Sequence, residues 1–305
     1  MRKAFIEALV RHAEADEKVW LVTGDLGFSV LEVFRDKFPG RYLNAGVAEQ
    51  NMMGVAAGLA LDGKTVFVYS IANFPLLRPY EQLRNDVCYH QLNVKVVAVG
   101  GGLAYGSAGY SHHGVEDLAV ARVLPNLRVF APGDPVETRL CVAELVRTPG
   151  PAYLRLGKGG EPVVHQTEPT LTVGQPLRLR AGTSVTICST GAVLGLCVAA
   201  ADELARQGIS AEVLSVPSLV PLDPEPVLAA VRATGRLICV EEHGDGGLTS
   251  VLAELIAGAG VATRFASLRL PKQPFKTAGT QDALRSSVGL TSAGVVELAR
   301  RLVTT

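Results

Sequence analysis

Residues 44–70 read NAGVAEQNMMGVAAGLALDGKTVFVYS, and this stretch decides the fold. Its first part, AEQNMMGVAAGLALDG, has the length and apolar character of a buried helix. Its second part, KTVFVYS, is a short and nearly continuous apolar run. Such runs are typical of strands in a parallel sheet whose two faces are covered by helices. The stretch therefore predicts one helix–strand unit of an α/β domain.

The same alternation of helical and strand-like segments continues on both sides of this stretch. Further strand-like runs are predicted at 19–25, 93–102, 128–133, 152–157, 184–191, 210–216 and 236–243. Asp134, three residues before Glu137, is a helix-start signal between two of them. We therefore predict two α/β domains, each built on a parallel sheet.

The boundary between the two predicted domains lies in the segment KGGEPVVHQTEPTLTVGQP, residues 158–176. It contains several Gly and Pro residues and has no clean periodicity, which is typical of a linker. We predict a first domain at 1–160, a linker at 161–176 and a second domain at 177–305.

The composition excludes some partners. The chain has 305 residues, of which 48% are hydrophobic, and its 29 Lys and Arg balance its 29 Asp and Glu. Zero net charge argues against nucleic acid or a membrane surface as the main partner. An apolar chain without net charge tends to self-associate, so we expect an oligomer.

Neither a targeting segment nor a membrane span is predicted. Charged residues such as Glu7 interrupt the apolar residues of the N-terminus, and no stretch is long enough to cross a bilayer. The cysteines are odd in number and form no C-x-x-C pair, so we expect buried, reduced thiols in a cytoplasmic protein. They are Cys88, Cys141, Cys188, Cys197 and Cys239.

The glycine-rich run AVGGGLAYGSAGYSHHG, residues 98–114, does not fit a dinucleotide-binding loop. Gly100 and Gly102 would require a third glycine at position 105, where Tyr105 stands. We expect an irregular loop at the carboxyl end of a strand, which is where open α/β sheets bind ligands. His112 and His113 lie on this loop, and the residues alone leave open whether they form a site or are solvated.

Glu49, in the first turn of the predicted helix, has two interpretations. A Glu three residues after Gly46 complements the free N–H groups and the dipole of a helix start. A carboxylate flanked by Val47, Met52 and Met53 could equally be partly desolvated and tuned for proton chemistry. The residues alone leave both open.

The helix segment NAGVAEQNMMGVAAGLA resembles a helix shared by transketolases, deoxyxylulose-phosphate synthases and 2-oxoacid dehydrogenase β subunits. Six further segments resemble the transketolase family in the same order along the chain. They are RKAF (2–5), GDLGFS (24–29), YSHHGVEDLA (110–119), FAPGDPVET (130–138), PAYLRLGK (151–158) and VEEHGDGGLTSVLAELI (240–256). The resemblance covers almost the entire chain and implies the pyrimidine-binding and C-terminal domains of a thiamine-diphosphate enzyme.

The resemblance also implies a partner. In transketolases, the domain that binds the cofactor's diphosphate and Mg²⁺ precedes the RKA segment, and no counterpart is seen here. We expect a separate subunit to supply that domain and the Mg²⁺ ligands, in an α2β2 complex, with a β2 dimer when this chain is made alone. The run Gly-Asp-Gly at 244–246 begins like the family's Mg²⁺-diphosphate motif, but no Asn follows at the motif's spacing. We interpret it as a turn into a helix.

For the cofactor, the resemblance implies roles for three residues. The family equivalent of Glu49 hydrogen-bonds N1′ of the aminopyrimidine ring and thereby activates the cofactor. The aromatic residue that stacks on this ring corresponds to Phe74, with Tyr69 as the alternative.

For the substrate, the resemblance implies that His112 contacts oxygens in the active site. Arg2 and Ser29 match residues at the phosphate end, and Lys158 stands where a phosphate-binding arginine is usual. Lysine can hold a phosphate as a point charge, without the bidentate fork of arginine.

Two departures from the family pattern bear on the substrate. Ala108 stands where transketolases have an aspartate that binds the acceptor's hydroxyl, and Gly100 stands where they have an additional histidine. The resemblance therefore implies a two-carbon ketol transfer on a substrate other than the ordinary pentose phosphates.

Rival functions stay open. The β subunit of a 2-oxoacid dehydrogenase or decarboxylase would leave Arg2, Ser29 and Lys158 without a role, and a deoxyxylulose-phosphate-synthase-like enzyme is a further alternative. A rival of another class is a non-catalytic scaffold, and the presence of Glu49 argues against it.

Overall fold

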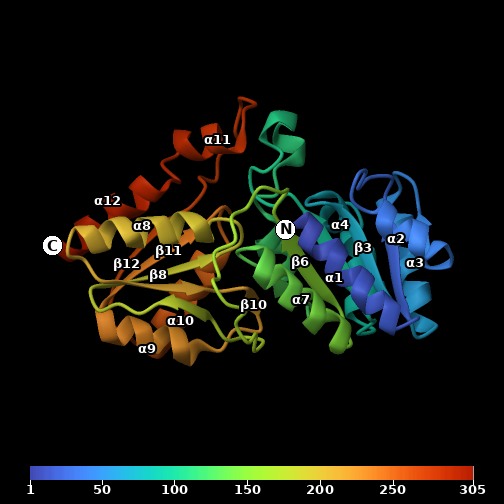
Figure 1. Ribbon diagram of the computed structural model, residues 1–305, viewed down its shortest axis with the longest axis horizontal. Helices are drawn as coiled ribbons and strands as arrows, with labels where there is room; N and C mark the ends of the chain where they lie inside the picture. Colours follow the sequence, from blue (N-terminus) through green and yellow to red (C-terminus); the bar gives the residue numbers. More distant parts are fainter. Residues whose placement is uncertain (305) are drawn as a thin grey trace.

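The computed structural model describes residues 1–304 and contains two α/β units (Figure 1). The N-terminal sheet consists of β1 (Val19–Thr23), β2 (Tyr42–Asn44), β3 (Thr65–Ile71), β4 (Val94–Val99), β5 (Arg128–Phe130), β6 (Ala152–Leu156) and β10 (Ser218–Val220). Its strand order is β10-β5-β6-β4-β3-β1-β2. Every pairing is parallel except that of β10 with β5.

The C-terminal sheet consists of β7 (Leu177–Arg180), β8 (Val185–Thr190), β9 (Ala211–Ser215), β11 (Arg236–Glu241) and β12 (Arg264–Leu268). Its order is β12-β11-β8-β9-β7, and only the edge strand β7 pairs antiparallel. The predicted fold class of two mostly parallel α/β sheets is confirmed. The strand β10 belongs by sequence to the second half but completes the first sheet.

The longer helices cover both faces of each sheet. They are α1 (Arg2–Ala15), α3 (Glu49–Leu61), α6 (Asp117–Arg122), α7 (Pro135–Arg147), α8 (Leu194–Arg206), α9 (Pro224–Thr234), α10 (Leu248–Ala259) and α12 (Ser292–Thr304). Helices α1 and α7 share one apolar cluster with the N-terminal sheet, and α3 and α6 pack on its other face. In the C-terminal unit, α8 and α12 lie on one face and α9 and α10 on the other (Figure 1).

The short helical turns lie mainly in the connections. They are α2 (Glu32–Lys37), η1 (Pro39–Arg41), α4 (Phe74–Leu77), α5 (Tyr80–Gln82), η2 (Leu83–Cys88), η3 (Gly106–Ala108), η4 (Tyr110–His112) and α11 (Gln281–Ser287). The sequence favours one helix at 76–90, but Pro79 separates α4 from α5. Proline lacks a backbone N–H and clashes with the preceding turn, which explains the interruption.

Helix α3 corrects a second expectation, because it is not buried on all sides. Met52, Met53 and Ala56 face the core, whereas Leu61 and the adjacent Val47 are exposed. An apolar helix with one bare face is typical of a surface that another chain covers.

Several local predictions are confirmed. The Asp134 carboxylate accepts a hydrogen bond from the Glu137 N–H at 2.8 Å, with Pro135 in the first turn of α7. The glycine run at 244–247 leads directly into α10. All five cysteines are buried and free.

The carboxyl end of β11 joins the two units. The Glu241 carboxylate accepts the N–H groups of Leu248 and Thr249 at 2.7 and 2.8 Å. His243 Nε2 accepts the N–H of Leu118, from the N-terminal unit, at 3.1 Å. His243 therefore links the two units, whereas Glu241 binds within the C-terminal unit. Among residues 1–304, no helix is long and apolar enough to cross a membrane.

Candidate functional site

Polar and aromatic residues gather where the parallel strands of the N-terminal sheet end. Ser29 follows β1, Phe74 follows β3, His112 follows β4 and Lys158 follows β6. The carboxyl ends of parallel strands lie at one edge of the sheet, which is the usual ligand-binding edge of open α/β folds. The site residues predicted from separate motifs therefore share one edge.

Glu49 lies at this edge, just after β2, and its side chain is only 4% exposed. Ala48, the N-cap of α3, makes no side-chain capping bond, and the Glu49 carboxylate instead accepts a hydrogen bond from Arg78 at 2.7 Å. The side chain of Arg78 is 46% exposed. Glu49 is thus a buried acid whose partner in the described part of the chain lies at the surface, which favours the proton-chemistry interpretation over simple capping.

Arg78 also connects Glu49 to the predicted stacking residue. Its guanidinium carbon lies 3.9 Å from the centre of the Phe74 ring. Phe74 is half-buried, and its ring contacts the His112 ring edge to face with centroids 5.2 Å apart. Glu49, Arg78, Phe74 and His112 therefore form one continuous row. The sequence reasoning missed Arg78, although its position four residues after Phe74 is the spacing of neighbours on a helical turn.

Tyr69 is a correction. Its side chain is 1% exposed, and its ring stacks on Phe5 with centroids 5.8 Å apart. Burial raises the pKa of its phenol well above the usual value. A ring enclosed in the core has no free face for a cofactor, so Phe74 is the remaining candidate.

Arg2, Ser29 and Lys158 line one cavity of about 830 Å³. The Arg2 guanidinium donates to the backbone carbonyl of Lys158. The acids in the wall are engaged elsewhere: Glu7 pairs with Lys3, and Glu32 accepts the Ser29 N–H at 2.8 Å. Among residues 1–304, the structure pairs neither Arg2 nor Lys158 with a carboxylate.

The loop that carries Ser29 has an unusual backbone. Asp25 and Ser29 adopt left-handed conformations, with φ of 57° and 63°. Such conformations are uncommon for residues other than glycine and concentrate at functional sites. Here they occur in the loop that forms one wall of the cavity.

The two loop histidines differ. His112 is half-buried, with Nδ1 3.0 Å from the Ser111 hydroxyl. His113 is fully buried between Tyr110 and Phe275, and neither of its ring nitrogens has a hydrogen-bond partner within residues 1–304. Burial lowers the pKa of His113. Of the pair, His112 is the one that contacts Phe74.

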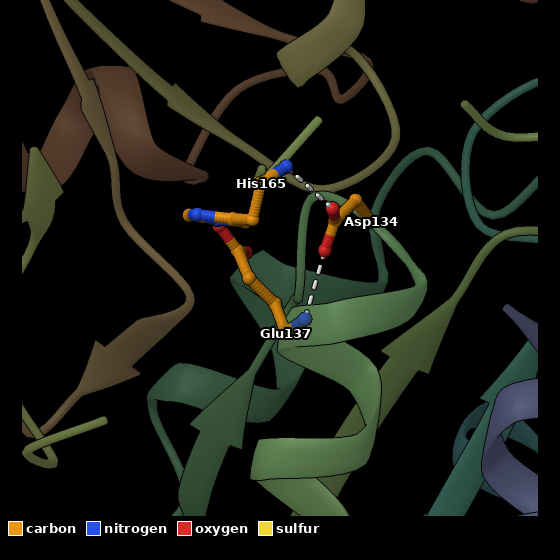
Figure 2. Close-up of side chains that lie close together, drawn as sticks. All are labelled: Asp134, Glu137 and His165. Atoms are coloured by element: carbon orange, nitrogen blue, oxygen red, sulfur yellow. Dashed lines mark hydrogen bonds and ion pairs between the residues drawn. The ribbon is translucent and has the colours of Figure 1, made fainter. Parts of the chain in front are cut away.

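A second cluster of ionisable groups lies away from this edge, where the linker crosses the start of α7 (Figure 2). Glu137 Oε1 is 2.8 Å from His165 Nε2, while its other oxygen accepts the Gly133 N–H. The Asp134 carboxylate accepts the N–H groups of Glu137, Val164 and His165. Backbone donors bind both Asp134 oxygens and one Glu137 oxygen, and the His165 ring binds the other Glu137 oxygen, so the arrangement ties the linker to α7.

Comparison with known proteins agrees with this geometry. Residues 1–161 match the family described as transketolase, pyrimidine binding domain, and residues 174–295 match transketolase, C-terminal domain. Residues 162–173 lie between these two ranges.

Relatives with named activities cover the chain from end to end. One subunit of the apulose-4-phosphate transketolase of Phocaeicola vulgatus is 35% identical over 99% of this chain and 97% of its own length. The 6-deoxy-6-sulfo-D-fructose transketolase subunit SqwH of a Clostridium species is 34% identical over 99% of this chain and 94% of its own.

A solved structure described as a split gene transketolase, inactive beta4 tetramer, is 36% identical and superposes with a TM-score of 0.89, covering 99% of this chain and 97% of that one. Both domains and their order agree with one family. The chain therefore belongs to the transketolase family, as a subunit that carries the pyrimidine-binding and C-terminal domains.

Proposed function

We propose that this chain is the pyrimidine-binding subunit of a thiamine-diphosphate-dependent transketolase that transfers a two-carbon ketol unit between anionic sugars. The observation that carries the proposal is the cavity lined by Arg2, Ser29 and Lys158, at the same sheet edge as Glu49 and His112. An acid, an aromatic ring and a histidine lie at one part of this edge, and cations lie at another.

The residues present fit the pyrimidine half of the cofactor. The buried Glu49 carboxylate can share a proton with ring nitrogen N1′, and the half-buried Phe74 ring can stack on the heterocycle. Arg78 now contacts both groups, and its exposed guanidinium is free to move aside when the ring enters. When bound, thiamine diphosphate supplies the electron sink for breaking the carbon–carbon bond next to a ketone.

His112 is placed to act at the reacting carbon. Its ring contacts Phe74, so it lies beside the proposed position of the cofactor ring. An imidazole there can donate a hydrogen bond to the substrate carbonyl oxygen and exchange a proton with it.

The cavity favours substrates with a terminal anion. Arg2 and Lys158 supply two positive charges, and the Ser29 hydroxyl adds a donor. Attraction at this remote end helps to position the reacting carbonyl. The names of two relatives, one for a sugar phosphate and one for a sulfosugar, support this class. Because an ammonium group acts as a point charge, Lys158 suits either phosphate or sulfonate.

A second chain that completes the site is part of the proposal. Phe28 and Val47 are each 72% exposed and lie on the loops around Glu49. Bare apolar side chains beside a buried acid favour a covering chain, which we propose carries the diphosphate and Mg²⁺ ligands in an α2β2 complex. The solved relative described as an inactive beta4 tetramer supports the need for a partner. The buried free cysteines support a reducing, cytoplasmic location.

A second candidate is a deoxyxylulose-phosphate-synthase-like reaction. The synthase of Heliobacterium modesticaldum is 34% identical over 98% of this chain, which spans 46% of its length. As its name says, that enzyme forms 1-deoxy-D-xylulose 5-phosphate, so the product separates the two candidates.

The test is reconstitution with a diphosphate-binding subunit of the split type. We expect co-purification, an α2β2 mass by light scattering, and ketol transfer that requires both chains, thiamine diphosphate and Mg²⁺. Phosphorylated and sulfonated ketoses should serve as donors. Formation of 1-deoxy-D-xylulose 5-phosphate without ketol transfer would support the second candidate. Full activity of a monomer of this chain alone would end the proposal.

A further inference from the structure

The side chain of Tyr105 depends on the bare backbone at Gly100. Gly100 has φ of 82°, and a Cβ built there would lie 2.1 Å from Cε2 of Tyr105 and 2.2 Å from Cδ2. The Gly100 N–H is fixed by a 2.8 Å bond to the Leu156 carbonyl, so this backbone cannot easily retreat. Any side chain at position 100 would therefore displace the ring. The residue that departs from the family pattern thus makes room for a tyrosine five positions later.

Tyr105 lies near residues of both ends of the proposed site. Lys158 Nζ lies 4.8 Å from the centre of its ring, within cation–π range. The centroid of the His112 ring lies 6.3 Å from that of the Tyr105 ring. Lys158 belongs to the anion-binding cavity, and His112 belongs to the row that begins at Glu49. A substrate that spans the two ends would pass this ring.

The phenol is suited to donate a hydrogen bond. Tyr105 is half-buried, and burial raises the pKa of its hydroxyl, an effect that the nearby positive charge of Arg2 opposes. The hydroxyl therefore keeps its proton at neutral pH. A phenol can donate to a sugar hydroxyl, and its ring orients the Lys158 ammonium at the same time.

We infer that Tyr105 is a specificity-determining residue that donates a hydrogen bond to an oxygen on the carbon chain of an anionic sugar, between the anion held by Lys158 and the carbonyl near His112. The inference rests on the proposed function and adds a hydroxyl group that binds the substrate. Gly100 and Ala108 cannot supply a polar side chain here, and Tyr105 supplies one from the same loop.

The test measures binding, so that it does not depend on turnover. Isothermal titration of the reconstituted complex with a four-carbon sugar phosphate and with inorganic phosphate is compared for wild type, Tyr105→Phe and Lys158→Ala. Tyr105→Phe keeps the ring against Gly100 and under Lys158 and removes only the hydroxyl. We expect its affinity for the sugar phosphate to fall about 3- to 10-fold, the effect of one neutral hydrogen bond, with inorganic phosphate unchanged. Lys158→Ala should weaken both ligands.

Tyr110→Phe is the matched control, because it removes a phenol hydroxyl from the same loop. That hydroxyl donates to Glu116 and is thus already engaged within the chain. We expect wild-type affinity for both ligands.

The outcomes separate the two proposals. If Tyr105→Phe binds the sugar phosphate as tightly as wild type does, the Tyr105 ring only fills the space beside Gly100 and the inference is wrong. The proposal of an anion-binding cavity is unaffected by that result. If wild type binds neither ligand, the anionic-substrate proposal fails and this inference fails with it. Equal losses of both ligands in Tyr105→Phe would show that the residue only supports Lys158.

Discussion

The loop after β4 and the loop after β11 are built from the same kinds of residue but use them differently. Each follows an interior parallel strand and contains histidine beside a run of glycines. After β11, the polar groups are consumed internally: Glu241 binds the start of α10 and His243 accepts the Leu118 N–H. After β4, His112 and Tyr105 meet aromatic rings and the cation of Lys158 beside a cavity. Ionisable residues at strand ends are therefore not enough to identify a site.

Two Glu–Arg pairs make the same contrast. Glu242 binds Arg285 through two nitrogens, at 2.9 and 2.5 Å, and the arginine side chain is only 11% exposed. Glu49 binds Arg78 through one nitrogen, and the side chain of that arginine is 46% exposed. A buried pair with all bonds made supports the fold. A buried acid with an accessible partner can exchange that partner for a ligand.

Glu49→Gln should give the largest effect on the functional side. The amide keeps the shape of the side chain but cannot share a proton with N1′ as a carboxylate does. In the reconstituted complex we expect turnover to fall by about two to four decades, the range for general acid–base groups. Stability should change little, because water can solvate Arg78 once its partner is neutral. Steady-state kinetics measure turnover, and thermal unfolding measures stability. Wild-type turnover in this variant would mean that Glu49 only stabilises the start of α3.

Glu242→Ala should give the opposite result. It leaves Arg285 buried without its carboxylate and removes an acceptor from the Leu103 N–H. Breaking a buried pair from one side costs about 3–5 kcal/mol, so we expect a large fall in the midpoint of urea unfolding. The double variant Glu242→Met with Arg285→Met should recover part of the loss, because no unpaired charge remains. A stable but inactive Glu242→Ala would show that the Glu242–Arg285 pair serves activity and not the fold.

The fold followed from the sequence where burial alone decides it. Apolar runs such as VKVVAV at β4 can hardly be anything other than covered strands, and Asp134 ahead of Pro135 fixes a helix start locally. The placement of β10 was not predictable in this way, since its pairing with β5 is a contact between distant segments. The exposed face of α3 was missed because an apolar sequence does not reveal which surface a second chain covers.

The candidate site was predictable only in part, for similar reasons. Glu49, His112 and Lys158 stand in recognisable motifs, so a resemblance could suggest their roles. Arg78 and Tyr105 depend on where a side chain points after folding. Tyr105 in particular reaches its position because Gly100 has no Cβ. Tyr69 and Phe74 lie close together in sequence, and only their burial separates a core ring from a candidate stacking ring.

Lys158→Ala sharpens the comparison at the cavity. The side chain supplies a charge that the structure pairs with no carboxylate in residues 1–304, so its removal should cost binding and not stability. We expect the KM for anionic sugars to rise about 10-fold, equivalent to about 1.4 kcal/mol, with little change for a short neutral donor and none in cofactor affinity. Parallel kinetics with a phosphorylated and an uncharged donor measure this. Equal losses for both donors would mean that Lys158 does not bind the anion.

The smallest expected effect concerns the cluster of Asp134, Glu137 and His165. Like the Glu242–Arg285 pair, its groups bind one another and the backbone, so we expect it to support the fold. The hydrogen bond from His165 to Glu137 raises the pKa of His165 above its usual 6.5. Protonated His165 is therefore favoured in the folded state. Its contribution to stability is fully present below the unfolded pKa and is lost as the pH rises through the folded pKa. We expect His165→Gln to be less stable than wild type by on the order of 1 kcal/mol at acidic pH, with a difference that shrinks at alkaline pH.

Urea unfolding of wild type and His165→Gln at pH 6 and pH 9 measures this difference, with the exposed His90→Gln as control. The control should behave as wild type at both values, because its side chain is solvated. A deficit of equal size at both pH values would mean that His165 acts through packing alone.

Zinc provides a second check. If Zn²⁺ raised the melting temperature of wild type but not of His165→Gln, then Asp134, Glu137 and His165 would bind metal. The cluster would then be a ligand-binding site and not a structural one. We expect no such shift, since the carboxylates of Asp134 and Glu137 already accept four backbone N–H groups, from Gly133, Glu137, Val164 and His165.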